Sequence, residues 1–82
     1  MTNHETFWSL YEKTLADFIT ANPDDYCLLV TETPESFAKR VATKMRANRV
    51  NDVSTNTKAF RATMRKLSIK PSRKALAAYL GE

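Results

Sequence analysis

The segment HETFWSLYEKTLADFITA (residues 4–21) decides the fold, because it predicts a helix with more apolar surface than one neighbour can cover. Four of its apolar residues recur at spacings of 4, 4 and 3 and so share one helical face: Phe7, Tyr11, Leu15 and Phe18. Three more widen this face to about half of the circumference, beyond the stripe of roughly 100° seen on one-sided helices: Trp8, Leu10 and Ile19. We expect this helix to contact other elements on two sides.

The same wide apolar face leads to a prediction about self-association. A chain of 82 residues has difficulty covering such a face within its own core, and proteins that read DNA grooves commonly pair about a two-fold axis. We predict a homodimer that forms through the first helix, with Trp8 and Ile19 in the interface. Replacing either residue with Asp should then dissociate the dimer without unfolding it.

Proline and glycine divide the rest of the chain into three further helices, over about 34–48, 56–68 and 72–80. Their start and stop signals are, in order: Thr33 before Pro34, one of Ser54, Thr55 and Asn56, then Ser72, and finally Gly81. Their expected core positions are Phe37, Val41, Met45, Phe60, Met64, Leu67, Leu76, Tyr79 and Leu80. Residues 24–30 (DDYCLLV) contain an apolar run that periodicity does not separate into helix or extended chain, and we favour a buried connector.

The predicted fold is a small all-α, single-domain bundle of about four helices, because so short a chain supports only one core. Residues 1–33 form an acidic helix and connector, and residues 34–82 form a compact basic three-helix unit that the first helix packs across. Hydrophobic residues make up 43% and charged residues 27%, as in a folded soluble domain. Neither a membrane span nor a signal peptide is present in the pattern, and we expect a cytoplasmic protein.

Enzymatic chemistry finds little support in these residues. With Gly81 as the only glycine, a phosphate-binding glycine loop is excluded. Cys27 and His4 are the only pair for nucleophilic catalysis and are too few for a structural zinc site. Because Cys27 lies in an apolar run, we predict that it is buried and unreactive. We expect a non-enzymatic protein with no cofactor and no metal.

Charge is distributed very unevenly along the chain. Residues 1–36 carry seven acidic side chains and one basic one, a net charge of −6, whereas residues 37–82 carry twelve bases and two acids, a net charge of +10. Such a basic half attracts polyanions, of which nucleic acid is the commonest large example. Two alternatives remain: the charges only solvate the outer faces of helices, or the acidic half neutralises the basic half.

The segment RKLSIKPSRKALAAYL (residues 65–80) reads as two short helices joined by a turn. Its Leu67-Ser68-Ile69 is similar to the Leu-Gly-Ile that often precedes the turn of helix-turn-helix regulators, although Ser68 occupies the glycine position. Ile69 to Leu76 is seven residues, about two longer than in the compact motif, and Pro71 lies between them. The resemblance is to a motif class and covers the last third of the chain. It implies a second helix that meets DNA with its outer face.

These observations predict a DNA-binding protein, in the manner of a small transcriptional regulator. The expected contact residues are Lys58, Arg61, Arg65, Lys66, Lys70, Ser72, Arg73, Lys74, Ala77 and Ala78. Five bases of the second helix and the loop after it would extend the surface: Lys39, Arg40, Lys44, Arg46 and Arg49. The alternatives are an adaptor or inhibitor that binds a protein through its polarised charge, and a protein that binds RNA.

Overall fold

In the computed structural model, which describes residues 2–26, 28, 31–47 and 57–81, the apolar segment forms helix α1 (Asn3–Ala21). The helix begins where the Thr2 hydroxyl accepts a hydrogen bond from the backbone N–H of Glu5. It ends at Asn22, and a short 3-10 helix, η1 (Pro23–Asp25), follows. The predicted position of the first helix is confirmed.

Three further α-helices complete the described part of the chain, which contains no strand: α2 (Pro34–Arg46), α3 (Lys58–Lys66) and α4 (Arg73–Leu80). The predicted all-α class is therefore confirmed. Thr33 caps α2 through a reciprocal pair of hydrogen bonds with Ser36. The N-cap of α3 is Thr57 rather than one of residues 54–56, and its side chain makes no capping hydrogen bond. Gly81 ends α4 in the expected left-handed conformation, with φ 77°.

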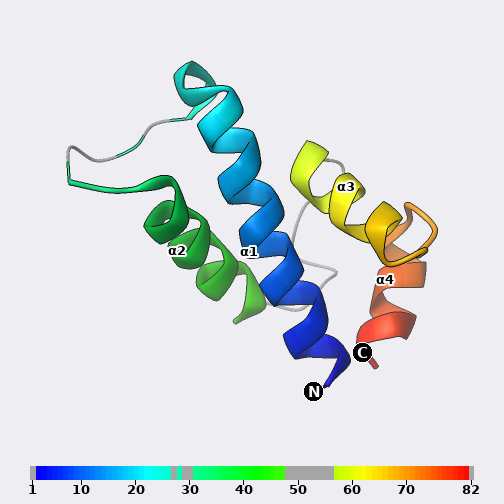
Figure 1. Ribbon diagram of the computed structural model, residues 1–82. Coiled ribbons are helices and arrows are strands. Elements are labelled where there is room, and N and C mark those ends of the chain that lie inside the picture. Colours follow the sequence, from blue (N-terminus) through cyan, green and yellow to red (C-terminus); the bar gives the residue numbers. More distant parts are fainter. Residues whose placement is uncertain (1, 27, 29–30, 48–56, 82) are drawn as a thin grey trace.

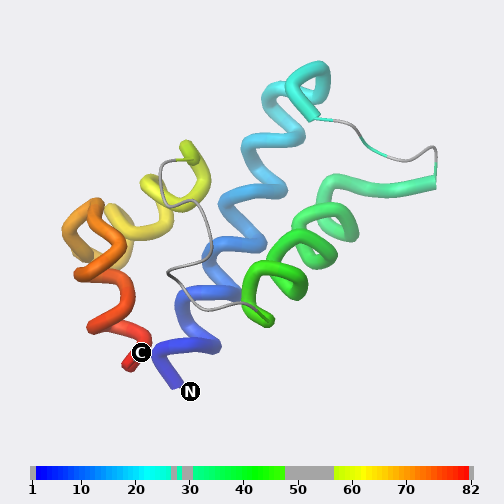
Figure 2. Tube along the Cα trace, turned by 180° about the vertical axis from the view of Figure 1, so that it is seen from behind, coloured from blue at the N-terminus to red at the C-terminus, as the bar shows by residue number. Residues whose placement is uncertain are grey.

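Helix α1 is the element on which the other helices pack. Figure 1 shows α2 on one side of α1 and the pair α3 and α4 on the other, and the reverse view in Figure 2 agrees. Each of these three helices makes its main contacts with α1 rather than with the other two. Two-sided contact of the first helix is thus confirmed. The arrangement differs from the expected compact unit of helices two to four, because α1 lies between α2 and α3.

Four aromatic rings form the centre of the core, where α1 meets α3. Phe7, Trp8 and Tyr11 of α1 surround Phe60 of α3, and the rings of Tyr11 and Phe60 lie only 4.5 Å apart between centroids. All four side chains are buried. Edge-to-face pairs such as Phe7 with Trp8 contribute beyond their buried area. The chain ends also meet, since the Asn3 side-chain amide donates to the carbonyl of Tyr79 over 2.8 Å.

Burial corrects the predicted interface of the dimer. Trp8 is 3% exposed and Ile19 is fully buried, both within the monomer's own core. The flanking helices cover the wide face of α1, which removes the reason to expect a partner there. An Asp at either position would be buried without a counter-charge, so it would unfold the chain rather than dissociate a dimer.

The structure also corrects the packing face of α2. Its buried residues are Ala38 and Ala42, whereas Phe37, Val41 and Met45 pack at the edge of the core and stay partly exposed. Neighbouring residues lie 100° apart about the axis of a helix, so a rotation of α2 by that angle exchanges the two sets. Small side chains at the contact bring the backbones of α1 and α2 close together.

Two predictions concern the segment after α1. The sequence favours a buried connector at residues 24–30. Its first residues instead belong to η1 (Pro23–Asp25), which is exposed, whereas Tyr26 and Leu28 are partly buried. The predicted burial of Cys27 lies outside the described residues. Within the described residues, no helix combines the length and apolarity needed to cross a membrane.

Candidate nucleic-acid interface

Residues 57–81 form a continuous basic stretch that contains no Asp or Glu. All seven of its Lys and Arg residues are exposed: Lys58, Arg61, Arg65, Lys66, Lys70, Arg73 and Lys74. The side chains of five of them make no hydrogen bond or ion pair within the described part of the chain: Lys58, Arg61, Arg65, Lys70 and Lys74. We call these five residues the basic surface. Self-neutralisation by the acidic half does not occur among them.

Helix α3 supplies three of the five charges on one stripe. Lys58, Arg61 and Arg65 lie at spacings of three and four residues, opposite the buried Phe60 and Met64. This is the orientation that the sequence predicts. Like charges four residues apart destabilise a helix slightly, so Arg61 and Arg65 gain nothing from each other.

A small hollow of about 100 Å³ lies beside this stripe. Arg61 and Arg65 line it together with Ile69 and Pro71 of the following turn. The two guanidinium groups thus border a recess whose other wall is apolar. The sequence placed Ile69 and Pro71 in the turn between two helices and indicated no contact with the arginines. Their place beside the arginines depends on the path of the turn, for which the sequence contains no periodic signal.

The turn between α3 and α4 reverses the chain through a left-handed residue. Ser68 has φ 58°. Its N–H donates to the carbonyl of Arg65, and the N–H of Ile69 donates to that of Met64 over 2.8 Å. This pair of hydrogen bonds is a Schellman motif, whose left-handed position favours glycine. Ser68, which stands at the glycine position of Leu-Gly-Ile, thus adopts a conformation that favours glycine, and Leu67 and Ile69 on either side pack partly buried against the core.

Helix α4 presents fewer contact residues than predicted. Lys74 and Ala78 are exposed as expected, but Ala77 is partly buried and packs against the core. It lies on the Leu80 side of the helix because 77 and 80 are three residues apart. Ser72 is the N-cap of α4, and its hydroxyl accepts a hydrogen bond from the backbone N–H of Ala75. This side chain therefore already has a structural role.

Two other predicted bases are engaged within the fold. The Lys66 ammonium donates to the hydroxyl of buried Thr14 on α1, over 3.2 Å, so its charge turns toward α1. On α2, Arg40 makes a two-pronged ion pair with Glu32, at 2.8 and 3.3 Å, and stacks over Phe37. This hydrogen bonding raises the pKa of Arg40. Arg40 therefore does not add free charge to the surface.

The remaining bases of α2 lie away from α3. Lys39, Lys44 and Arg46 belong to a helix on the opposite side of α1, as both overall views show. These three residues are exposed on a different helix and so do not extend the basic surface laterally. Arg49 lies outside the described residues.

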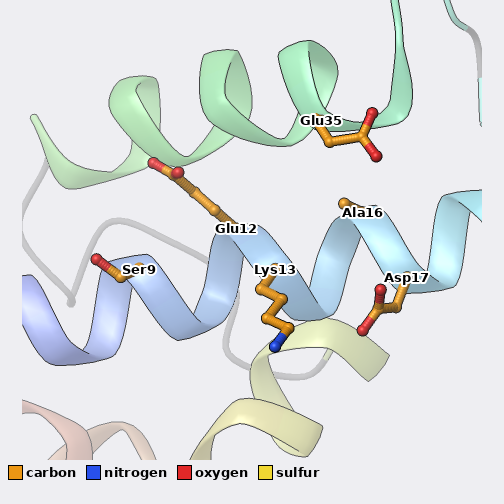
Figure 3. A pocket seen from close by; sticks show the side chains of 6 residues that line it. All are labelled: Ser9, Glu12, Lys13, Ala16, Asp17 and Glu35. Carbon is orange, nitrogen blue, oxygen red and sulfur yellow. The ribbon is translucent and has the colours of Figure 1, made fainter.

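Acidic side chains gather in a different place, in a hollow of about 300 Å³ between α1 and α2. Its lining includes Glu12, Asp17 and Glu35, with Lys13 beside them. Figure 3 shows Glu12 extending from α1 toward α2, and Lys13 extending to the other side. Among the described residues, no group of three or more His, Cys, Asp or Glu side chains is placed to hold a metal ion. These carboxylates belong to α1 and α2, whereas the basic surface lies on α3, the turn and α4.

Comparison with known proteins gives no relative. No family profile, no curated protein and no solved structure matches the chain.

Proposed function

We propose that this protein binds duplex DNA through the basic surface on α3, the turn and α4. The supporting observation is the exposure of seven Lys and Arg residues with no acidic residue in the same 25-residue stretch, 57–81. A solvated helix face usually mixes the two signs. A single-sign surface instead raises the local concentration of polyanions, and each Lys or Arg that meets a phosphate releases a counterion.

The geometry divides the work between two sets of residues. The stripe on α3 supplies charge along a line, as contacts with successive phosphates require, and such contacts position a protein without reading sequence. Helix α4 exposes Lys74 at its N-terminal end, which is the end that meets base edges in helix-turn-helix proteins, and Ala78 one turn further along. Regulation of transcription would follow from sequence preference in this second set.

Salt dependence of binding is the first test. If the four residues of the basic surface other than Lys74 contact phosphates, the logarithm of the affinity should fall against log salt with a slope of about −3.6, at about −0.9 for each contact. Fluorescence anisotropy with labelled duplexes at several salt concentrations measures this slope. No duplex binding even at about 50 mM salt would contradict the proposal and favour the adaptor.

Matched variants test the location of the contacts. Arg61→Ala and Arg65→Ala should each weaken binding to every sequence and reduce the slope by about 0.9. Arg46→Ala, the same change on the exposed face of α2, should leave both quantities unchanged. Equal losses in all three variants would mean that net charge, and not this surface, determines binding.

Sequence preference is tested separately on α4. Lys74→Ala should change the ranking of duplexes in competition binding, at about 1–3 kcal/mol for a lost base contact. A uniform loss across sequences would reduce Lys74 to a phosphate contact. Single-stranded and duplex RNA in the same competition would show whether DNA is the preferred polyanion.

A further inference from the structure

An apolar hollow of about 230 Å³ lies where α1, α2 and the start of α3 meet. Its lining includes Tyr11 from α1, Tyr26 after η1, and Phe37, Val41 and Met45 from α2, with Lys58 of α3 among the lining residues. We call it the apolar hollow. It is separate from the recess beside Arg61 and Arg65, and it results from the packing face of α2: Ala38 and Ala42 occupy the contact, so the large side chains next to them are left at the edge.

The walls of the apolar hollow favour an aromatic occupant. Tyr26 and Phe37 meet edge to face, with ring centroids 6.2 Å apart, and the Arg40 side chain that is held by Glu32 covers the Phe37 ring at 5.0 Å. Three partly exposed apolar side chains of α2 border the same space. Partly exposed aromatic edges of this kind pair well with another ring.

The hydroxyl of Tyr11 is a poorly satisfied donor in one wall. Tyr11 is 2% exposed, and its hydroxyl donates only to the Met45 thioether sulfur, over 3.5 Å, in the described part of the chain. Thioether sulfur is a weak acceptor. An oxygen atom of a bound molecule would be a stronger acceptor, so the Tyr11 hydroxyl can donate a hydrogen bond to a ligand in the hollow.

Charge at the hollow is positive. Lys58 is exposed and makes no ion pair within the described residues, and the lining includes no acidic side chain among them. The ammonium group therefore complements an anionic group on a molecule whose body enters between the aromatic walls. A tyrosine hydroxyl with the ordinary pKa of 10.0 is already protonated at neutral pH, and burial raises the pKa of Tyr11 further, to about 12, so this hydroxyl is a donor there.

We propose that the apolar hollow is a binding site for a small aromatic carboxylate of one or two rings, with the rings against Tyr26 and Phe37 and the carboxylate near Lys58. Volume sets the size, because an apolar cavity of about 150 Å³ accommodates benzene, while drug-sized ligands occupy about 300 Å³ or more. The inference goes beyond nucleic-acid binding and does not depend on it.

The test uses naphthoate as the probe and naphthylmethanol as its uncharged counterpart. Calorimetric titration should show one naphthoate per chain, and the amide NMR signals of Val41 and Tyr26 and the methyl signals of Val41 should shift. Lys58→Gln should weaken naphthoate by roughly two- to five-fold, as expected for an exposed ion pair, and leave naphthylmethanol unchanged. Lys70→Gln, the same substitution elsewhere on the basic surface, should affect neither probe.

A second variant tests the hollow without its charge. Val41→Phe should fill part of the space and reduce the affinity of both probes, with circular dichroism and thermal unfolding to verify the fold. The absence of saturable binding up to about millimolar naphthoate would overturn the proposal. It would also be overturned by signal shifts confined to Arg61 and Arg65, or by equal effects of Lys58→Gln and Lys70→Gln, since these place the probe on the charged surface.

Discussion

Ser68 is the only residue other than glycine with positive φ in the part of the chain that the structure describes. A left-handed conformation at φ 58° costs an L-residue about 1–2 kcal/mol, and glycine avoids most of this while losing more entropy on folding. We therefore predict that Ser68→Gly raises the free energy of unfolding by about 0.5–1 kcal/mol. Urea denaturation measures the change.

The control for this substitution is Ser9→Gly. Ser9 is exposed in the middle of α1, where glycine weakens a right-handed helix by about 0.5 kcal/mol relative to serine. The two serine-to-glycine changes should therefore have opposite signs. A destabilised Ser68→Gly variant would show that loss of the hydroxyl and the extra entropy lost by glycine together outweigh the relief of backbone strain.

Tyr11 makes the free energy of unfolding depend on pH in the alkaline range. Burial, followed by the charge of Tyr26, raises its pKa from 10.0 to about 12, so the folded state disfavours the phenolate. The resulting stabilisation is fully present below pH 10 and is lost as the pH rises through the interval to about 12. At 1.36 kcal/mol per pKa unit, the loss approaches about 3 kcal/mol.

Tyr11→Phe isolates this contribution from the other groups that titrate at alkaline pH. We expect the variant to lose less stability than the wild type between pH 10 and pH 12, when both are unfolded in urea at each pH. Parallel pH profiles would mean that Tyr11 titrates as an exposed tyrosine does.

At the scale of the helix, the like charges of the stripe on α3 favour DNA binding but lower the stability of the helix. Arg61→Glu would replace a like-charge pair with a carboxylate four residues before Arg65, which is the favourable order for an ion pair, in the N-terminal half of the helix. We predict that unfolding becomes costlier by about 0.5–1 kcal/mol while DNA affinity falls.

Thermal unfolding and anisotropy on the same preparation would check both effects of Arg61→Glu. Arg61→Gln should be intermediate in each measurement. Loss of binding together with loss of stability would show that the stripe is needed for folding, which would remove the basis for assigning it to a ligand.

Helix positions were predictable from the sequence because apolar spacing and caps act locally. The starts of α2 and α4 followed from Thr33 and Ser72, and exposure of the α3 bases followed from burial of Phe60. The face of α2 was not predictable in this way. Apolar size favours Phe37 in the core, but close approach of two backbones favours Ala38, and that choice depends on α1.

The candidate interface shows the same limit. Its positive charge was predictable because residues 57–81 contain Lys and Arg but no Asp or Glu. The pairing of Arg40 with Glu32 spans eight residues and depends on the path into α2, and the partial burial of Ala77 depends on how α4 rotates against the core. Neither leaves a periodic pattern, so both required the tertiary structure.

For the molecule as a whole, a substitution at Ile19 tests how far the fold depends on the packing of α1. We predict that Ile19→Asp largely unfolds the monomer, because it removes a fully buried side chain and buries an unpaired carboxylate, at more than about 3 kcal/mol. Thr20→Asp, one residue further on the exposed side, should stay within about 1 kcal/mol of the wild type. Circular dichroism distinguishes them.

Light scattering over a concentration series addresses self-association separately. If the Ile19→Asp variant is folded and has a lower molar mass than the wild type, the hypothesis of a dimer through α1 would be supported again. A wild type that is dimeric beside an unfolded variant would place the contact on another surface.

The central position of α1 also has a kinetic consequence. Since α2 on one side and α3 with α4 on the other rest mainly on α1, either flank can detach while the other remains docked. Native-state hydrogen exchange should therefore reveal two separate sub-global openings, with the middle of α1 exchanging only through complete unfolding. The two flanks would then open as separate foldons that share a single helix.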